Sequence, residues 1–109
     1  MPPPPIGCRM GSKKQILLII RTDVVPEMEE EFNHWYDEEH IPRLLAVPGV
    51  IWAKRGINIG NGQKYIAIYE HENPEVQHTS AYRDALETEW TQRIRPHLRN
   101  FTREIYELL

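Results

Sequence analysis

One stretch, residues 33–42, constrains the fold of this chain more than any other. It reads Asn33-His34-Trp35-Tyr36-Asp37-Glu38-Glu39-His40-Ile41-Pro42. Residues three, four and seven apart share one face of a helix. One narrow stripe therefore carries polar and titratable side chains: Asn33, Tyr36, Asp37 and His40. The neighbouring stripe is apolar and predicts the side that faces a core: Met28, Phe32 and Trp35. Such a helix borders both a core and a cavity.

Prolines set the expected bounds of this helix. Pro26 suits the first helical position, so we expect the helix to begin there and to run to about His40. Ile41 precedes a proline and is biased out of the α region, whereas Pro42 suits the start of a new helical turn. Pro48-Gly49 then predicts a turn.

Hydrophobic periodicity predicts four strands and a second helix around this segment. The strands are expected at residues 15–22, 50–59, 63–71 and 101–108, and Gly60-Asn61-Gly62 is a strong hairpin signal between the middle two. Asn73-Pro74 predicts a helix start, and Pro96 ends that helix near Arg95. The order β-α-β-β-α-β predicts an α+β fold, the ferredoxin-like plait, with a four-stranded antiparallel sheet and helices on one face.

The second face of such a sheet needs a cover. We expect it to be apolar, with Leu17 and Ile19 on one strand and Tyr65 and Tyr69 on another, or their alternates. A large apolar patch usually marks an interface or a ligand site. Two sheets packed face to face would cover it, so we expect an isologous homodimer.

Composition limits the class of protein. The 109 residues suffice for one domain, expected at residues 14–109 after a mobile, disordered Pro-rich leader at residues 1–13. The net charge of -3, with basic residues scattered among acids, does not favour binding to nucleic acid or to a membrane surface. Residues 16–20, the longest apolar run, are too short to span a bilayer. The single Cys8 excludes an intramolecular disulfide and fits a reducing, cytoplasmic location.

The segment from Asn33 to Val50 resembles a known superfamily. Its Asn-x-Trp-Tyr, Glu-His-Ile-Pro and Val47-Pro48-Gly49-Val50 elements are similar to those of the dimeric α+β barrel proteins, and most similar to EthD-like members. The strand at residues 64–70 also fits. The resemblance implies a homodimer whose paired sheets form a barrel, with a ligand cavity between sheet and helices. It also implies that His40 lies at the cavity as an acid, a base or a ligand-orienting donor.

His40 is therefore the first candidate for chemistry. Histidine titrates near neutrality and can move a proton next to a carbonyl group. Asp37 is placed to fix its tautomer, and Tyr36 to donate to a developing oxyanion. The alternative is that His40 caps the end of the helix and that Tyr36 is half-buried core.

Five further residues are candidates for binding a ligand. Arg55 interrupts an apolar strand face, where it suits a carboxylate or phenolate, but it could equally reach the sheet edge or pair with Glu70. Aromatic residues of the strands could line a cavity or fill the dimer interface. The expected ligand-binding set is Asn33, Arg55, Trp52, Tyr65 and Tyr69.

The sequence leaves the reaction open. His34 and His40 are out of phase on one helix, and no His-Glu-x-x-His pattern is present, so we expect no metal and no other bound cofactor. The leading hypothesis is an enzyme of the lyase, cyclase, isomerase or monooxygenase type that acts on a small aromatic or polyketide-like carbonyl compound. One alternative is a non-catalytic protein that binds a small apolar or aromatic ligand as an accessory of a catabolic or biosynthetic pathway. A third option is a haem enzyme or metalloenzyme on this fold.

Overall fold

The computed structural model describes residues 14–109, so the leader expected at residues 1–13 lies outside the described residues. Four strands form a single antiparallel sheet: β1 (Ile16–Val24), β2 (Val50–Ile57), β3 (Tyr65–His71) and β4 (Leu98–Glu107). Their order across the sheet is β2-β3-β1-β4. β1 therefore pairs with both β3 and the C-terminal β4.

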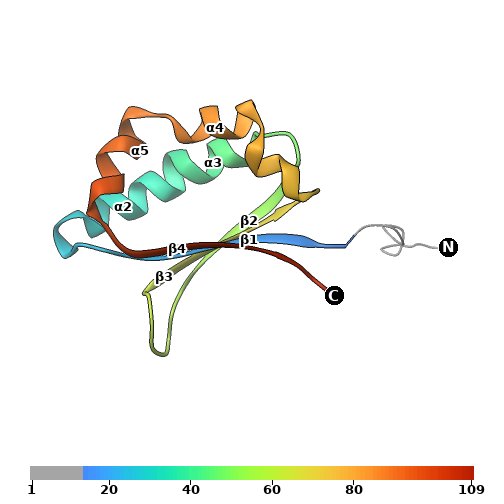
Figure 1. Ribbon diagram of the computed structural model, residues 1–109. Coiled ribbons are helices and arrows are strands. Elements are labelled where there is room, and N and C mark those ends of the chain that lie inside the picture. Colours follow the sequence, from blue (N-terminus) through green and yellow to red (C-terminus); the bar gives the residue numbers. More distant parts are fainter. Residues whose placement is uncertain (1–13) are drawn as a thin grey trace.

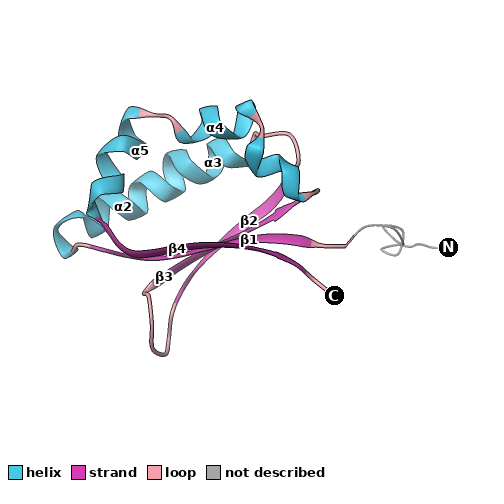
Figure 2. Cartoon of the chain, viewed as in Figure 1, coloured by secondary structure: helices cyan, strands magenta, loops and turns pink. Residues whose placement is uncertain are grey.

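The helices connect these strands in two groups. The first group joins β1 to β2 through η1 (Pro26–Met28), α2 (Glu29–Trp35), η2 (Tyr36–His40) and α3 (Ile41–Leu45). The second joins β3 to β4 through η3 (Pro74–His78), α4 (Ser80–Leu86), α5 (Glu89–Ile94) and η4 (Arg95–His97). Figure 1 shows both groups on the same side of the sheet, and Figure 2 shows that no helix within residues 14–109 covers the opposite side. This is the four-stranded ferredoxin-like α+β architecture that the sequence predicted.

Pro42 lies in the first turn of α3 as expected, but the predicted departure of Ile41 from helical angles was wrong. Ile41 has helical dihedral angles, φ -64° and ψ -47°, and the helix continues through Pro42 to Leu45. The segment that accommodates the proline is η2, a π-helical turn in which the Ile41 amide donates to the Tyr36 carbonyl, five residues back. Proline has no amide hydrogen to donate, and a wider turn lets the helix pass it without breaking.

The second helix is also different from its prediction. Asn73 does cap its start, because its side chain accepts a 2.9 Å hydrogen bond from the Glu75 amide. However, the expected continuous helix is three shorter pieces. Thr79 and Thr88 each cap the next piece, their hydroxyls accepting the amides of Tyr82 and Thr91. Threonine favours such caps over a helix interior, so it restarts the helix twice.

The bounds of the strands differ from those expected, and the register shows which residues face the helices. β1 extends to Val24, β2 ends at Ile57, and β4 begins at Leu98 rather than at Phe101. The register pairs Leu18 with Tyr69. Tyr65 and Tyr69 therefore lie on the helix-covered face, where both are buried. Their alternates, Ile66 and Ile68, lie on the uncovered face with Leu17 and Ile19.

The core forms between the helices and the inner face of the sheet. Its fully buried side chains include Leu18 from β1, Phe32 from α2, Leu44 from α3 and Ile94 from α5. The turn into β2 packs tightly against the second helical group, since Gly49 has φ +98° and a Cβ there would lie 2.5 Å from Val76 Cγ2. Only glycine satisfies both the backbone angle and the space at this turn.

Candidate functional site

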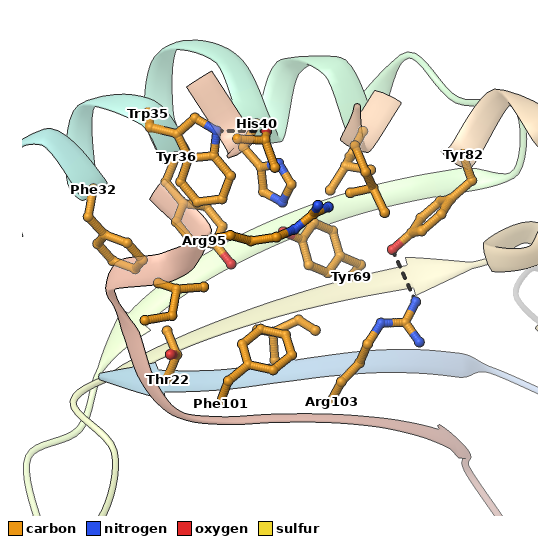
Figure 3. A pocket seen from close by; sticks show the side chains of 15 residues that line it. Thr22, Phe32, Trp35, Tyr36, His40, Tyr69, Tyr82, Arg95, Phe101 and Arg103 are labelled. Atoms are coloured by element: carbon orange, nitrogen blue, oxygen red, sulfur yellow. Dashed lines mark hydrogen bonds between the residues drawn. The ribbon is translucent and has the colours of Figure 1, made fainter. Parts of the chain in front are cut away.

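A cavity of about 420 Å³ lies between the inner face of the sheet and the helices. Its volume falls within the range of small-molecule sites. Figure 3 shows side chains from both layers converging on this space. The lining residues are Ile20, Thr22, Phe32, Trp35, Tyr36, His40, Leu44, Tyr69, Tyr82, Leu86, Thr91, Arg95, Leu98, Phe101 and Arg103.

The π-helical turn η2 supplies two of the cavity's polar side chains, Tyr36 and His40. His40 is only 8% exposed, and its Nδ1 is buried with no hydrogen-bond partner among residues 14–109. Burial, together with the positive charge of Arg95, lowers the pKa of His40 from 6.5 to about 3. At neutral pH the imidazole is therefore uncharged.

Aromatic rings fix the orientation of His40. Its ring stacks on Trp35, with centroids 4.2 Å apart, and meets Tyr36 edge to face at 5.1 Å. The indole is held in turn, since Trp35 Nε1 donates a 3.0 Å hydrogen bond to Thr91 Oγ1 on α5 (Figure 3). The site thus depends on contact between the two helical groups.

Two tyrosine hydroxyls from opposite layers meet at the cavity. Burial raises the pKa of Tyr36 to about 12, and it raises the pKa of Tyr69 well above its usual value. The two hydroxyls influence each other's pKa, although the Tyr69 oxygen has no partner in hydrogen-bonding geometry among the described residues. Both side chains therefore remain protonated at neutral pH and can donate to a ligand oxygen.

Two arginines at the cavity were not identified from the sequence. Arg95 comes from η4 and Arg103 from β4, and both are exposed at the cavity's solvent side. Arg103 Nη2 lies 3.5 Å from the buried Tyr82 hydroxyl (Figure 3). Arg103 had a signal in the sequence, because it alternates with Phe101 and Ile105 on the inward face of the last strand. Arg95 had none, since it follows a helix end whose direction depends on tertiary packing.

Three of the predicted site residues form a separate cluster over β2. Arg55 donates to Asn33 Oδ1 at 2.7 Å and to Asp37 Oδ1 at 2.9 Å. Its guanidinium also lies over the Tyr36 ring, 4.5 Å from the ring centre. None of the three lines the cavity, and the expected pairing of Asp37 with His40 is absent. The predicted polar stripe is thus divided, with Asn33 and Asp37 on one side and Tyr36 and His40 on the other.

The three aromatic residues of the predicted ligand-binding set lie in three different places. Tyr69 lines the cavity, whereas Tyr65 lies beside the Arg55 cluster and contacts Asn33 through its hydroxyl at 3.2 Å. Trp52 faces the other side of the sheet, where its Nε1 donates a 2.6 Å hydrogen bond to Glu70. The structure therefore brings Tyr36, His40 and Tyr69 together at one cavity.

A second buried histidine lies near the cavity without lining it. His71, at the end of β3, is 1% exposed, and neither ring nitrogen has a partner among residues 14–109. Its ring packs edge to face against Tyr82, with centroids 5.7 Å apart. Burial and the charge of Arg103 lower its pKa.

Residues 14–109 contain neither a metal-binding cluster nor a membrane-spanning helix. Within residues 14–109 no group of three or more His, Cys, Asp or Glu side chains is arranged to hold a metal ion. No helix in this part of the chain is long and apolar enough to cross a membrane.

Comparison with solved structures found the same fold at low sequence identity. A proposed antibiotic biosynthesis monooxygenase from Bordetella bronchiseptica superposes with a TM-score of 0.72 and 15% identity, over 89% of this chain and 99% of the other. A proposed monooxygenase from Shewanella loihica gives a TM-score of 0.66 and 15% identity, over 91% and 98%. An ethyl tert-butyl ether D (EthD) family protein from Bacillus halodurans gives 0.54 and 17%, over 87% and 99%.

No protein-family model and no curated protein matched the sequence. The likeness therefore concerns the fold, which is shared along nearly the whole length of each neighbour. The chain shares the ferredoxin-like α+β fold of these solved structures, among them the proposed antibiotic biosynthesis monooxygenase and the EthD family protein.

Proposed function

We propose that this protein is a small-molecule enzyme without a bound cofactor, and that it acts on an aromatic or polyketide-like carbonyl compound in its cavity. The observation that carries the proposal is His40, a residue only 8% exposed whose Nδ1 has no partner within residues 14–109, at a cavity lined by aromatic rings. A buried polar atom without a partner is costly, so a role with a ligand explains its presence. The neighbours described as monooxygenases support the same broad class.

The residues divide the chemistry between them. The neutral His40 accepts a proton from the carbon or oxygen next to the substrate carbonyl, and the protonated Tyr36 donates a hydrogen bond to the oxyanion that develops. Proton removal next to a carbonyl is a step shared by lyases, cyclases and isomerases. Asp37 has no part in this scheme, because Arg55 holds it outside the cavity.

Deuterium uptake tests the proton transfer directly. The probe is beta-tetralone, a bicyclic aromatic ketone, incubated with the protein in deuterated buffer and followed by proton NMR. We expect exchange next to the carbonyl to exceed the buffer rate, to fall by about a hundred-fold in His40→Gln and by about ten-fold in Tyr36→Phe. His34→Gln is the matched control, since His34 lies on the same helix but is exposed and paired with Glu38. Full activity in His40→Gln would rule out this assignment.

A non-catalytic binding protein is the second candidate, and one observation favours it. A pKa of about 3 makes His40 a weak base at neutral pH, whereas catalytic bases are usually tuned toward the working pH. This candidate predicts saturable binding of beta-tetralone with exchange at the buffer rate.

We also propose that the protein is a cytoplasmic homodimer. The sheet face without helices carries the half-buried, apolar side chains of Leu17, Ile19, Ile66 and Ile68, and a second copy of the chain would bury them. Native mass spectrometry should give a dimer, and Ile68→Glu should give a monomer. A monomeric wild-type protein would contradict the proposal.

A further inference from the structure

The two arginines at the cavity differ from every other arginine in residues 14–109. Arg21, Arg55 and Arg93 pair with carboxylates. Arg43, Arg83 and Arg99 donate to backbone carbonyls. Arg95 has no hydrogen bond or ion pair with this part of the chain, and the one partner of Arg103 is the neutral Tyr82 hydroxyl. Among the arginines of residues 14–109, only Arg95 and Arg103 have no carboxylate or carbonyl acceptor, and both line the cavity.

The cavity is also positive in a chain that is negative overall. None of its 15 lining residues is acidic, while the whole sequence carries a net charge of -3. The positive charge of Arg95 is felt inside, because it contributes to keeping the buried His40 uncharged. A second positive charge at His40 is therefore disfavoured, whereas a negative charge entering the same space is attracted.

The apolar and charged groups occupy different parts of the site. Trp35, Tyr36 and Tyr69 are buried and line its interior, while Arg95, Arg103 and the half-exposed Phe101 lie on its solvent side. Figure 3 shows Arg95 and Arg103 reaching toward this space from opposite layers, one from the helical side and one from the sheet. This separation suits a molecule with an aromatic body and a charged group at one end.

We infer that the cavity takes an anionic aromatic compound, of the carboxylate class, whose ring system lies among Trp35, Tyr36 and Tyr69 and whose negative group is held between Arg95 and Arg103. Guanidinium groups bind carboxylates through charge-assisted hydrogen bonds. This inference rests on the proposed function, because it specifies the ligand of the same cavity. It gives the two arginines a binding role that is independent of whether His40 transfers a proton.

A pair of fluorescent probes that differ only in charge tests the inference. Anilinonaphthalene sulfonate carries a negative group, and N-phenylnaphthylamine has the same aromatic skeleton without it. We expect the wild-type protein to bind the sulfonate about ten-fold more tightly than the neutral probe at low salt. Arg95→Gln and Arg103→Gln should each weaken sulfonate binding by about five- to ten-fold and leave the neutral probe unchanged. Both side chains are exposed, so neither variant should affect folding.

Arg83→Gln is the matched control. It removes the same charge from an exposed arginine of α4 whose guanidinium donates to the His78 carbonyl, outside the cavity. Sulfonate binding should not change in this variant. If Arg83→Gln weakens binding as much as the two cavity variants do, the effect is that of net charge, and the inference is overturned.

The outcomes separate this inference from the proposed function. Equal binding of the two probes, unaffected by either cavity variant, overturns the anion site and leaves an apolar ligand cavity. Failure of both probes to bind removes the cavity as a ligand site, and both proposals fail with it. A charge preference that depends on Arg95 and Arg103, without deuterium exchange in beta-tetralone, supports the anion site and favours the non-catalytic binding protein over the enzyme.

Discussion

The imidazole of His40 lies stacked on the indole of Trp35, with ring centroids 4.2 Å apart and planes 25° from parallel. The same indole donates its Nε1 hydrogen to Thr91 Oγ1 on α5, 56 residues further along the chain. The position of His40 thus depends on a polar contact between the two helical groups, and a change at Thr91, which itself lines the cavity, should affect His40 through the Trp35 indole.

Thr91→Val removes that contact at nearly constant volume. The indole hydrogen of Trp35 would then be buried without an acceptor, at a cost of about 1–3 kcal/mol in the free energy of unfolding. The midpoint of urea denaturation measures this loss. Thr102→Val on the exposed β4 is the control and should change stability by less than about 0.5 kcal/mol. Equal effects in the two variants would contradict a special role for the buried hydrogen bond.

Acid should destabilise the protein through His40. Its folded pKa of about 3 lies below the unfolded value of about 6.5, so the unfolded chain binds the proton first as the pH falls. The stabilising contribution is complete above pH ~6.5 and is lost progressively toward pH ~3, amounting to about 2 kcal/mol by pH ~5. His71, whose pKa is also lowered by burial, adds to the loss in the same direction.

Chemical denaturation at pH ~7 and at pH ~5 measures this effect. His40→Gln should show a pH dependence that is smaller by about 2 kcal/mol, since an amide does not titrate in this range. An unchanged dependence would mean that His40 takes up its proton equally well in the folded and unfolded chain.

Gly49→Ala should be strongly destabilising. The residue has φ +98°, and an added Cβ would lie 2.5 Å from Val76 Cγ2, so strain and overlap together should cost about 3 kcal/mol. Gly49→Ala should cost less stability in a Val76→Ala background than in the wild-type chain, because the smaller side chain relieves part of the overlap. Gly60→Ala, where the nearest atom lies at 3.5 Å, is the control and should be nearly neutral. Calorimetric melting temperatures compare the four variants.

Arg55→Lys should distinguish a structural role from a ligand-binding role. Lysine keeps the charge but lacks the planar fork with which two separate nitrogens reach Asn33 and Asp37, so we expect a loss of about 1 kcal/mol in stability. Binding of anilinonaphthalene sulfonate should stay at the wild-type level. A loss of binding without a loss of stability would return Arg55 to the ligand site.

Much of the fold could be predicted from local signals. The hairpin at Gly60-Asn61-Gly62, the cap at Asn73 and the alternation of β3 are properties of neighbouring residues, and together they give the β-α-β-β-α-β order. The face on which Tyr65 and Tyr69 lie could not be predicted in the same way. It depends on the pairing of β3 with β1, which involves residues more than 40 positions apart.

The site was predictable where it lies on one helix and unpredictable where it is assembled from several elements. Tyr36 and His40 share a helical face, so their common location follows from spacing. Asp37 shares that face too, but Arg55 on β2 competes for its carboxylate, which the spacing does not reveal. Thr91, Arg95 and Arg103 reach the cavity only through tertiary packing.

The π-helical turn that carries Tyr36 and His40 determines which side chains of α3 face the core. In this turn an amide donates to the carbonyl five residues back, whereas an α-helix uses the carbonyl four residues back. The turn therefore contains one residue more than an α-helical turn would. Deleting a single residue from this turn would rotate α3 by about 100° and place Pro42 in a regular helical turn, which it does not fit. Leu44 would then point away from the core, and β2, which follows the Pro48-Gly49 turn, would pair with β3 in a shifted register. Insertions and deletions are therefore excluded from this turn, even where substitutions within it are tolerated.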